Sequence, residues 1–175
     1  MTPLRIIFAG GGEFGAPTLH ALIALGHEVV QVVSQPDRPA GRGRKLHTTE
    51  ISQIALTRNL PLIRTTNINT ELLPAADVLV VIAFGQKIAP QVVDQPRFGS
   101  INLHASLLPK YRGAAPIHAA ILNGERETGN SVIRLADKMD AGAVLSQSRL
   151  AIGETETTSE LHDRLAKDGA ELIPR

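Results

Sequence analysis

The sequence contains no cysteine and no tryptophan, and it has only one tyrosine and four phenylalanines among its 175 residues. Without cysteine, the chain cannot form disulfides, thiolate metal sites or a cysteine nucleophile. With so few aromatic residues, a hydrophobic core has to be built from Ile, Val, Leu and Ala. Such a core suits buried parallel strands that are covered by helices. The lack of cysteine is also compatible with the cytoplasmic location that we expect.

The chain has neither a large charge excess nor a long apolar run. Its net charge is +1, so no overall basic field attracts nucleic acid, and any such role needs a local patch. No segment approaches the ~18 consecutive apolar residues of a membrane helix, and we therefore expect no membrane association. The N-terminal residues are too few for a signal peptide and predict a strand. The length matches one domain.

Strand and helix patterns alternate along the first two thirds of the chain. Apolar runs and their flanking turn residues predict strands at 4–9, 28–34, 62–64, 78–82, 100–104, 130–136 and 143–150, and helices at 16–25, 50–58, 116–122 and 158–173. This alternation predicts an α/β fold with a Rossmann-like, open, mostly parallel sheet flanked by helices, and the last strands add an antiparallel edge. Residues 35–49 are rich in Pro, Gly and basic side chains, and we expect no regular element there.

A glycine-rich turn joins the first strand to the first helix. Gly10 to Gly15 match the G-x-G-x-x-G pattern of dinucleotide-binding folds. That function also needs an acidic residue at the end of the second strand, and this strand ends in Ser34 and Gln35. Asp37 follows only in a loop, after a proline. We therefore expect a tight turn beside a ligand cleft, and a dinucleotide-binding module stays open as an alternative.

Two polar residues share one face at the end of a predicted strand. Asn102 and His104 alternate with apolar residues, so both point to the same side. Ligands of open α/β sheets bind at the carboxyl ends of strands. There an amide can donate to a developing oxyanion, and an imidazole can move a proton. Asp140, in a later loop, either forms a turn or brings a carboxylate to the imidazole. The alternative is that Asn102 and His104 only satisfy backbone groups of nearby loops.

Three segments carry a resemblance to a known family. The residues Asn102-Leu103-His104, Ser106 to Pro109 and Asp140-Ala141-Gly142 resemble the catalytic core of the folate-dependent formyltransferases. The segment SLLPKYRGAAPI at 106–117 is highly specific. The segment SQPDRPAGRGRKL at 34–46 resembles a loop of the members that act on methionyl-tRNA. The opening RIIFAGGGEF resembles RIIFAGTPEF of the family, with Gly11-Gly12 in place of Thr-Pro. The resemblance covers essentially the whole chain.

The resemblance implies a function and a set of site residues. The formyl donor would be 10-formyltetrahydrofolate, and the acceptor would be the α-amine of initiator methionyl-tRNA in translation initiation. Asn102 and protonated His104 would stabilise the oxyanion, while Asp140 keeps His104 charged and organises a water. The folate would lie between the turn after the 78–82 strand and the loop after His104, against Ala83, Phe84, Gly85, Gln86, Ile88, Ser106, Leu107, Leu108 and Pro109. Four basic residues would contact the tRNA: Arg38, Arg42, Arg44 and Lys45.

The resemblance also implies a domain organisation. Residues 1–175 would form the formyltransferase catalytic domain, and the C-terminal β-barrel that binds tRNA in the family would be absent from this chain. We expect a monomer. The six histidines show no ligand-like spacing, so we expect no metal. A different acceptor, such as an amino sugar or glycinamide ribonucleotide, remains an alternative, although the 35–46 loop argues against it.

Overall fold

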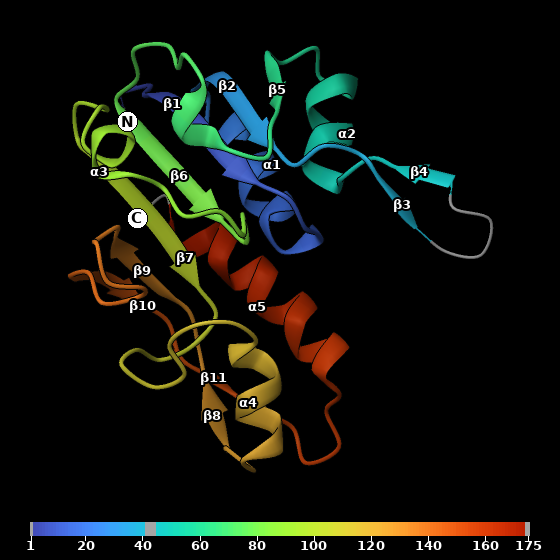
Figure 1. Ribbon diagram of the computed structural model, residues 1–175. Helices are drawn as coiled ribbons and strands as arrows, with labels where there is room; N and C mark the ends of the chain where they lie inside the picture. Colours follow the sequence, from blue (N-terminus) through green and yellow to red (C-terminus); the bar gives the residue numbers. More distant parts are fainter. Residues whose placement is uncertain (1, 41–44, 174–175) are drawn as a thin grey trace.

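A seven-stranded sheet forms the centre of the molecule (Figure 1). The computed structural model describes residues 2–40 and 45–173. The strand order is β10-β9-β7-β6-β1-β2-β5. Five strands run parallel: β1 (Arg5–Gly10), β2 (Glu28–Ser34), β5 (Leu62–Arg64), β6 (Val78–Ile82) and β7 (Ser100–His104). At one edge, β9 (Ser131–Arg134) and β10 (Val144–Gln147) are antiparallel. The predicted fold class is confirmed.

Helices cover one face of the sheet and shorter segments cover the other. The helices α1 (Ala16–Ala24), α2 (Glu50–Thr57) and α5 (Thr158–Leu172) pack on the first face through the larger apolar cluster. The short helices η2 (Ile68–Thr70) and α3 (Pro90–Val93) lie on the second face. Two further elements, η1 (Glu13–Gly15) and α4 (Pro116–Leu122), follow β1 and β7 in the chain and come near the carboxyl edge of the sheet.

The prediction for residues 35–49 is wrong. Two short strands, β3 (Arg38–Ala40) and β4 (Lys45–His47), pair antiparallel there. The proline-rich sequence is compatible with this hairpin because proline is tolerated in strands that lie at an edge. The hairpin projects from the body of the molecule (Figure 1).

The predicted strand at 143–150 is also divided. The chain leaves the sheet after Gln147, and β11 (Leu150–Ala151) pairs instead with β8 (Glu127–Thr128), which the sequence pattern did not predict. At the break, the Ser148 backbone N–H donates to the Asn130 carbonyl, which holds the bend. The strand predicted at 130–136 is shorter than expected and forms only over Ser131–Arg134.

Close packing fixes the strand that carries Asn102 and His104. Leu103 of β7 is buried, and Gly169 of α5 lies directly against it, so that a Cβ atom at position 169 would overlap the leucine side chain. The glycine therefore lets α5 approach the sheet beneath β7. Among the residues that the structure describes, no helix combines the length and apolar character needed to cross a membrane.

Candidate active site

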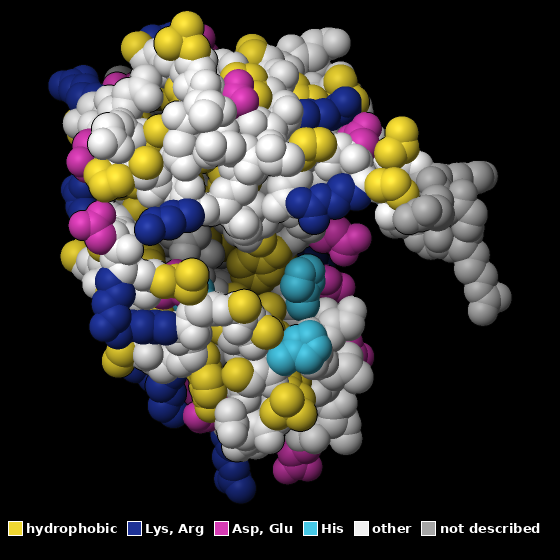
Figure 2. All heavy atoms as spheres, in the orientation of Figure 1, with side chains coloured by type: hydrophobic (Ala, Val, Ile, Leu, Met, Phe, Trp, Pro, Cys, Tyr) yellow, Lys and Arg dark blue, Asp and Glu magenta, His cyan; other side chains and the backbone are white. Residues whose placement is uncertain are grey.

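The polar residues predicted to be functional lie at the carboxyl edge of the sheet. Val81 of β6 pairs with Asn102 of β7, which brings the turn after β6 level with His104. Figure 2 shows a hollow on this face, above α4, with histidine side chains on its rim. In open α/β sheets this edge is where ligands bind, as the sequence pattern predicted.

Asn102, His104 and Asp140 come together although Asp140 is 36 residues beyond His104. One carboxylate oxygen of Asp140, Oδ2, lies 3.5 Å from His104 Nδ1, and the other, Oδ1, lies 3.5 Å from Asn102 Nδ2. The side chains of His104 and Asp140 are only 8% and 12% exposed. An amide donor and an imidazole thus face one largely buried carboxylate, an arrangement suited to stabilising an oxyanion and moving a proton.

A loop after β7 holds two members of this group from the other side. His104 Nε2 lies 2.8 Å from the Tyr111 carbonyl oxygen, and Gly113 N donates to Asp140 Oδ2 at 2.8 Å. Asp140 itself has a positive φ of 49°, a conformation that aspartate tolerates better than most residues. Sequence reasoning missed both loop contacts, because they use backbone atoms and have no signal in residue type.

The segment 106–109 is held from beneath by two side chains that sequence reasoning also missed. Ser131 Oγ donates to the Ser106 carbonyl at 2.6 Å and accepts from Leu108 N at 3.1 Å. Gln147 Nε2 donates to the Leu108 carbonyl at 3.1 Å. Ser106 is fully buried, and its own hydroxyl donates a hydrogen bond to the Lys110 carbonyl at 2.6 Å. Leu107 and Pro109 remain partly or fully accessible.

The turn 83–86 is equally well anchored. Phe84 is buried, and its carbonyl accepts a 2.8 Å hydrogen bond from Gln35 Nε2. Gln86 uses both ends of its amide, donating to the Thr65 carbonyl and accepting from Ile68 N, each at 2.8 Å. Ala83 and Gly85, with φ of 46° and 73°, are exposed between these anchors.

This turn has the character that a pterin ring requires. A pterin presents a flat edge of amide-like donors and acceptors, and Ala83 and Gly85 are the exposed residues of this turn. Gly85 has no side chain to hinder close approach. Ile88, which is partly buried and packs on the second apolar cluster, provides an aliphatic wall. The residues present therefore fit the implied folate.

The basic segment lies on the β3–β4 hairpin, away from the core. Arg38 is exposed on β3, and Leu46, the middle residue of β4, is 71% exposed. Arg42 and Arg44 lie outside the described residues, and for Lys45 only the backbone, in β4, is described. At the base of the hairpin, Asp37 Oδ2 lies 3.6 Å from Arg64 Nη1.

A charged cluster supports the loop beside His104. Glu125 Oε1 accepts from Lys110 Nζ at 2.9 Å and from the Tyr111 hydroxyl at 2.8 Å. The hydrogen bond from Lys110, followed by that from Tyr111, lowers the pKa of the Glu125 carboxyl. In return, the hydrogen bond to Glu125 raises the pKa of Lys110 and that of Tyr111. The carboxylate, the ammonium and the neutral phenol thus stabilise one another.

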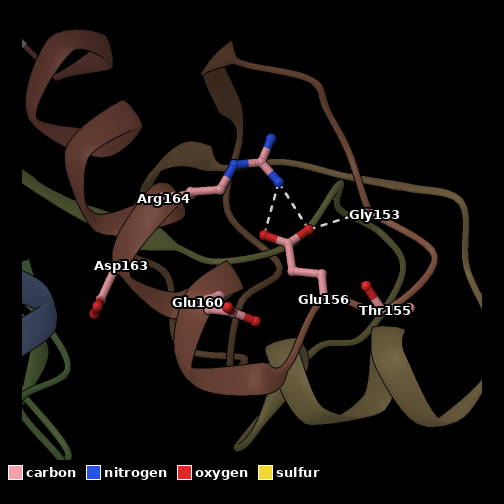
Figure 3. Close-up of a pocket in the computed structure, with 6 residues that line it drawn as sticks. All are labelled: Gly153, Thr155, Glu156, Glu160, Asp163 and Arg164. Atoms are coloured by element: carbon pink, nitrogen blue, oxygen red, sulfur yellow. Dashed lines mark hydrogen bonds and ion pairs between the residues drawn. The ribbon is translucent and has the colours of Figure 1, made fainter.

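A second hollow, of about 560 Å³, lies at the start of α5 but does not resemble an active site. Figure 3 shows that Arg164 and Glu156 face one another there: Arg164 Nη1 donates to both oxygens of Glu156 at 2.7 Å. Glu156 also accepts from Gly153 N, and Glu160 forms the capping box of the helix. Within residues 2–40 and 45–173, no three His, Cys, Asp or Glu side chains are grouped as a metal site would require.

Comparison with known proteins shows the family to which this chain belongs. A family model described as formyl transferase matches residues 4–175. The methionyl-tRNA formyltransferases of Methylococcus capsulatus and Thiobacillus denitrificans are 48% and 47% identical to this chain over 97% of its length. The chain spans 57% of the length of each of these curated relatives.

Solved structures share the fold at low sequence identity. A phosphoribosylglycinamide formyltransferase from Bacillus halodurans aligns with a TM-score of 0.76 and 17% identity, covering 97% of this chain and 91% of that one. A formyltetrahydrofolate deformylase from Pseudomonas syringae aligns with a TM-score of 0.77 and 18% identity, covering 99% of this chain and 60% of that one. At such identities the likeness concerns the fold alone.

Proposed function

Because this chain belongs to the formyl transferase family, we propose that it transfers the formyl group of 10-formyltetrahydrofolate to the α-amine of initiator methionyl-tRNA. The observation that carries the proposal is the meeting of Asn102, His104 and Asp140 at the carboxyl edge of the sheet. The acceptor is supported by the names of the relatives at 47–48% identity. The reaction belongs to the initiation of translation, and we assign it to the cytoplasm.

In the transfer, the amine nitrogen forms a bond to the formyl carbon, the bond from that carbon to the folate nitrogen breaks, and one proton passes from the amine to the leaving nitrogen. The formyl oxygen gains negative charge on the way. Asn102 Nδ2 is one donor for that oxygen, and His104 Nδ1 is the other once it has taken up a proton, since both residues point to the same side of β7. The carboxylate of Asp140 faces His104 Nδ1 and can hold a water that relays the proton.

The donor lies between the turn after β6 and the loop after β7. Backbone groups of Ala83, Phe84, Gly85 and Gln86 bind the pterin edge, with Ile88 behind it. On the other side the segment Ser106, Leu107, Leu108 and Pro109 forms the wall. The anchoring of both segments by Gln35, Gln86, Ser131 and Gln147 supports this placement, because a rigid backbone costs less entropy to bind a ligand.

The acceptor is bound through phosphate contacts. We assign this role to Arg38, Arg42, Arg44 and Lys45, which lie close together in the sequence, since basic side chains supply most nucleic-acid affinity. The curated relatives are longer than this chain, and we propose that residues 1–175 act as a catalytic domain beside a tRNA-binding β-barrel of the longer protein. We expect the working unit to be a monomer.

The test is a formylation assay with 10-formyltetrahydrofolate and methionyl-tRNA. It is run on this chain and on the chain extended by the C-terminal portion of a curated relative. His104→Ala should lower turnover by about 10²–10³-fold. The control is His20→Ala, at an exposed position of α1, which should leave turnover unchanged. Glycinamide ribonucleotide serves as the competing acceptor. Formylation of that compound and not of methionyl-tRNA would reject the tRNA assignment.

A further inference from the structure

The two ring nitrogens of His104 have different partners. Nε2 lies 2.8 Å from the carbonyl oxygen of Tyr111. A carbonyl oxygen can only accept a hydrogen bond, so Nε2 must carry a proton. Nδ1 faces Asp140 Oδ2 at the longer distance of 3.5 Å. The partner of one ring nitrogen fixes the tautomer of a histidine, and here that partner is the backbone of residue 111.

The direction of the Tyr111 carbonyl depends on how its loop is held. Tyr111 has a positive φ of 55°, a conformation that a bulky residue keeps only when its surroundings enforce it. On either side, the Lys110 carbonyl accepts from Ser106 Oγ and Gly113 N donates to Asp140. Neither of these contacts involves the side chain of Tyr111.

Glu125 supplies the remaining anchor. It follows α4 in the chain, and its Oε1 accepts from both the Tyr111 hydroxyl, at 2.8 Å, and Lys110 Nζ, at 2.9 Å. Two consecutive loop residues are thus tied to one carboxylate oxygen. These ties precede the peptide unit that carries the Tyr111 carbonyl, and the Gly113 contact follows it, so together they restrain the carbonyl toward His104 Nε2.

We propose that Glu125 is a positioning residue that acts through the Tyr111 carbonyl to keep His104 protonated at Nε2 with Nδ1 turned toward Asp140. The consequence for the tautomer stands on the geometry alone. The consequence for catalysis rests on the proposed function, because it assumes that Nδ1 is the nitrogen that serves the formyl oxygen. Loosening Tyr111 would remove the fixed acceptor of the Nε2 proton, so that the proton of the neutral ring could also occupy Nδ1, which faces Asp140 Oδ2.

The first measurement is long-range ¹H–¹⁵N NMR of the imidazole nitrogens in this chain. Comparison with His104→Gln identifies the His104 signals among the six histidines. In the neutral form of the ring, we expect the proton on Nε2 in the unmodified chain, and a mixture of the two tautomers in Glu125→Ala and Tyr111→Phe. Glu127→Ala is the matched control, since Glu127 pairs with Arg149 and not with this loop. An unchanged tautomer in both folded variants would overturn the proposal.

The second measurement separates kcat from KM in the formylation assay. Loss of one hydrogen bond of ordinary strength changes a rate by about 2–10-fold, and we expect kcat to fall by that factor in each variant while both KM values stay within twofold. The double variant should be no slower than the slower single variant, because both side chains act through one contact. A rise in KM with unchanged kcat would overturn the catalytic consequence. If the tautomer shifts in the variants but the unmodified chain formylates nothing, the proposed function is rejected and the positioning role stands.

Discussion

Gly142 lies directly against the backbone of Arg134, so that a Cβ atom at position 142 would overlap the Arg134 carbonyl oxygen. Arg134 ends β9, and its N–H donates to the Ala143 carbonyl at 2.9 Å. Because the contact is with backbone, Gly142→Ala must push the loop away from β9 and carry Asp140 away from Asn102 and His104. We expect a loss of about 1–3 kcal/mol in the free energy of unfolding, measured by urea denaturation, together with reduced formylation.

A matched control exists in the glycine-rich turn after β1. A Cβ atom on Gly12 would meet nothing within 4 Å, and the residue has a φ of −93° that any amino acid adopts. Gly12→Ala should therefore keep the stability of the unmodified chain. If Gly142→Ala were equally stable, the close contact with Arg134 would not exist in solution.

The sheet could be predicted because its strands are marked locally. The run Val78–Ile82 is β-branched and the polar turn residues around Ser100–His104 delimit β7, and both strands form where the pattern placed them. The parallel order follows from the alternation with helices. Asn102 and His104 could be found because strand periodicity puts them on one face, at the edge where ligands bind.

The surroundings of these residues could not be predicted, because they depend on contacts between distant backbone groups. The carbonyl of Tyr111 has no feature in the sequence that sets it apart from other carbonyls. Ser131 gives no local signal either, and its role appears only when the register pairs it with His104. The β3–β4 hairpin was missed because proline and glycine dominate its local pattern, while pairing at a free edge tolerates them.

The charge of Asp140 can be tested without changing its shape. Asp140→Asn keeps an oxygen that accepts from Gly113 N, and asparagine tolerates the positive φ of this position. What is lost is the negative charge beside His104 Nδ1, together with the second oxygen, which accepts from Asn102 Nδ2 at 3.5 Å. We expect kcat to fall by about 10²–10⁴-fold, the range for a group that assists proton transfer, with little change in thermal unfolding or in folate affinity. Near-normal kcat would show that the carboxylate charge is not used.

Gln35 offers a test of the turn 83–86, which we propose binds the folate. Its Nε2 donates to the Phe84 carbonyl at 2.8 Å, and it lies where the basic hairpin leaves β2. Gln35→Glu would place a carboxylate oxygen against that carbonyl, so we expect the turn 83–86 to move and tetrahydrofolate to bind about tenfold more weakly. Calorimetric titration measures this affinity. The control is Gln53→Glu, which makes the same change at an exposed amide that donates to the Thr48 carbonyl. An equal loss of tetrahydrofolate affinity in both variants would speak against a specific role for Gln35.

The cluster around Glu125 predicts a pH dependence of stability with a definite sign. The hydrogen bonds from Lys110 and Tyr111 lower the pKa of Glu125 below its ordinary 4.5. A lowered carboxyl pKa stabilises the fold above the ordinary value, and that contribution is lost as the pH falls through the lowered one. The raised pKa values of Lys110 and Tyr111, ordinarily 10.5 and 10.0, have the opposite sense. Their contributions are complete below pH 10.0 and are lost as the pH rises through the raised values.

Glu125→Gln should therefore be less stable than the unmodified chain between pH 4.5 and 10.0, and the difference should shrink below pH 4.5 as Glu125 takes up its proton. Urea unfolding of both proteins across this range measures the difference directly, because carboxyl groups common to both cancel in the comparison. Lys110→Met removes the ammonium group that has the largest effect on the pKa of Glu125. The difference in the free energy of unfolding between this variant and the unmodified chain should also shrink below pH 4.5. A stability difference that stays constant from neutral pH into that acid range would mean that the ionised carboxylate of Glu125 is not what holds Lys110 and Tyr111.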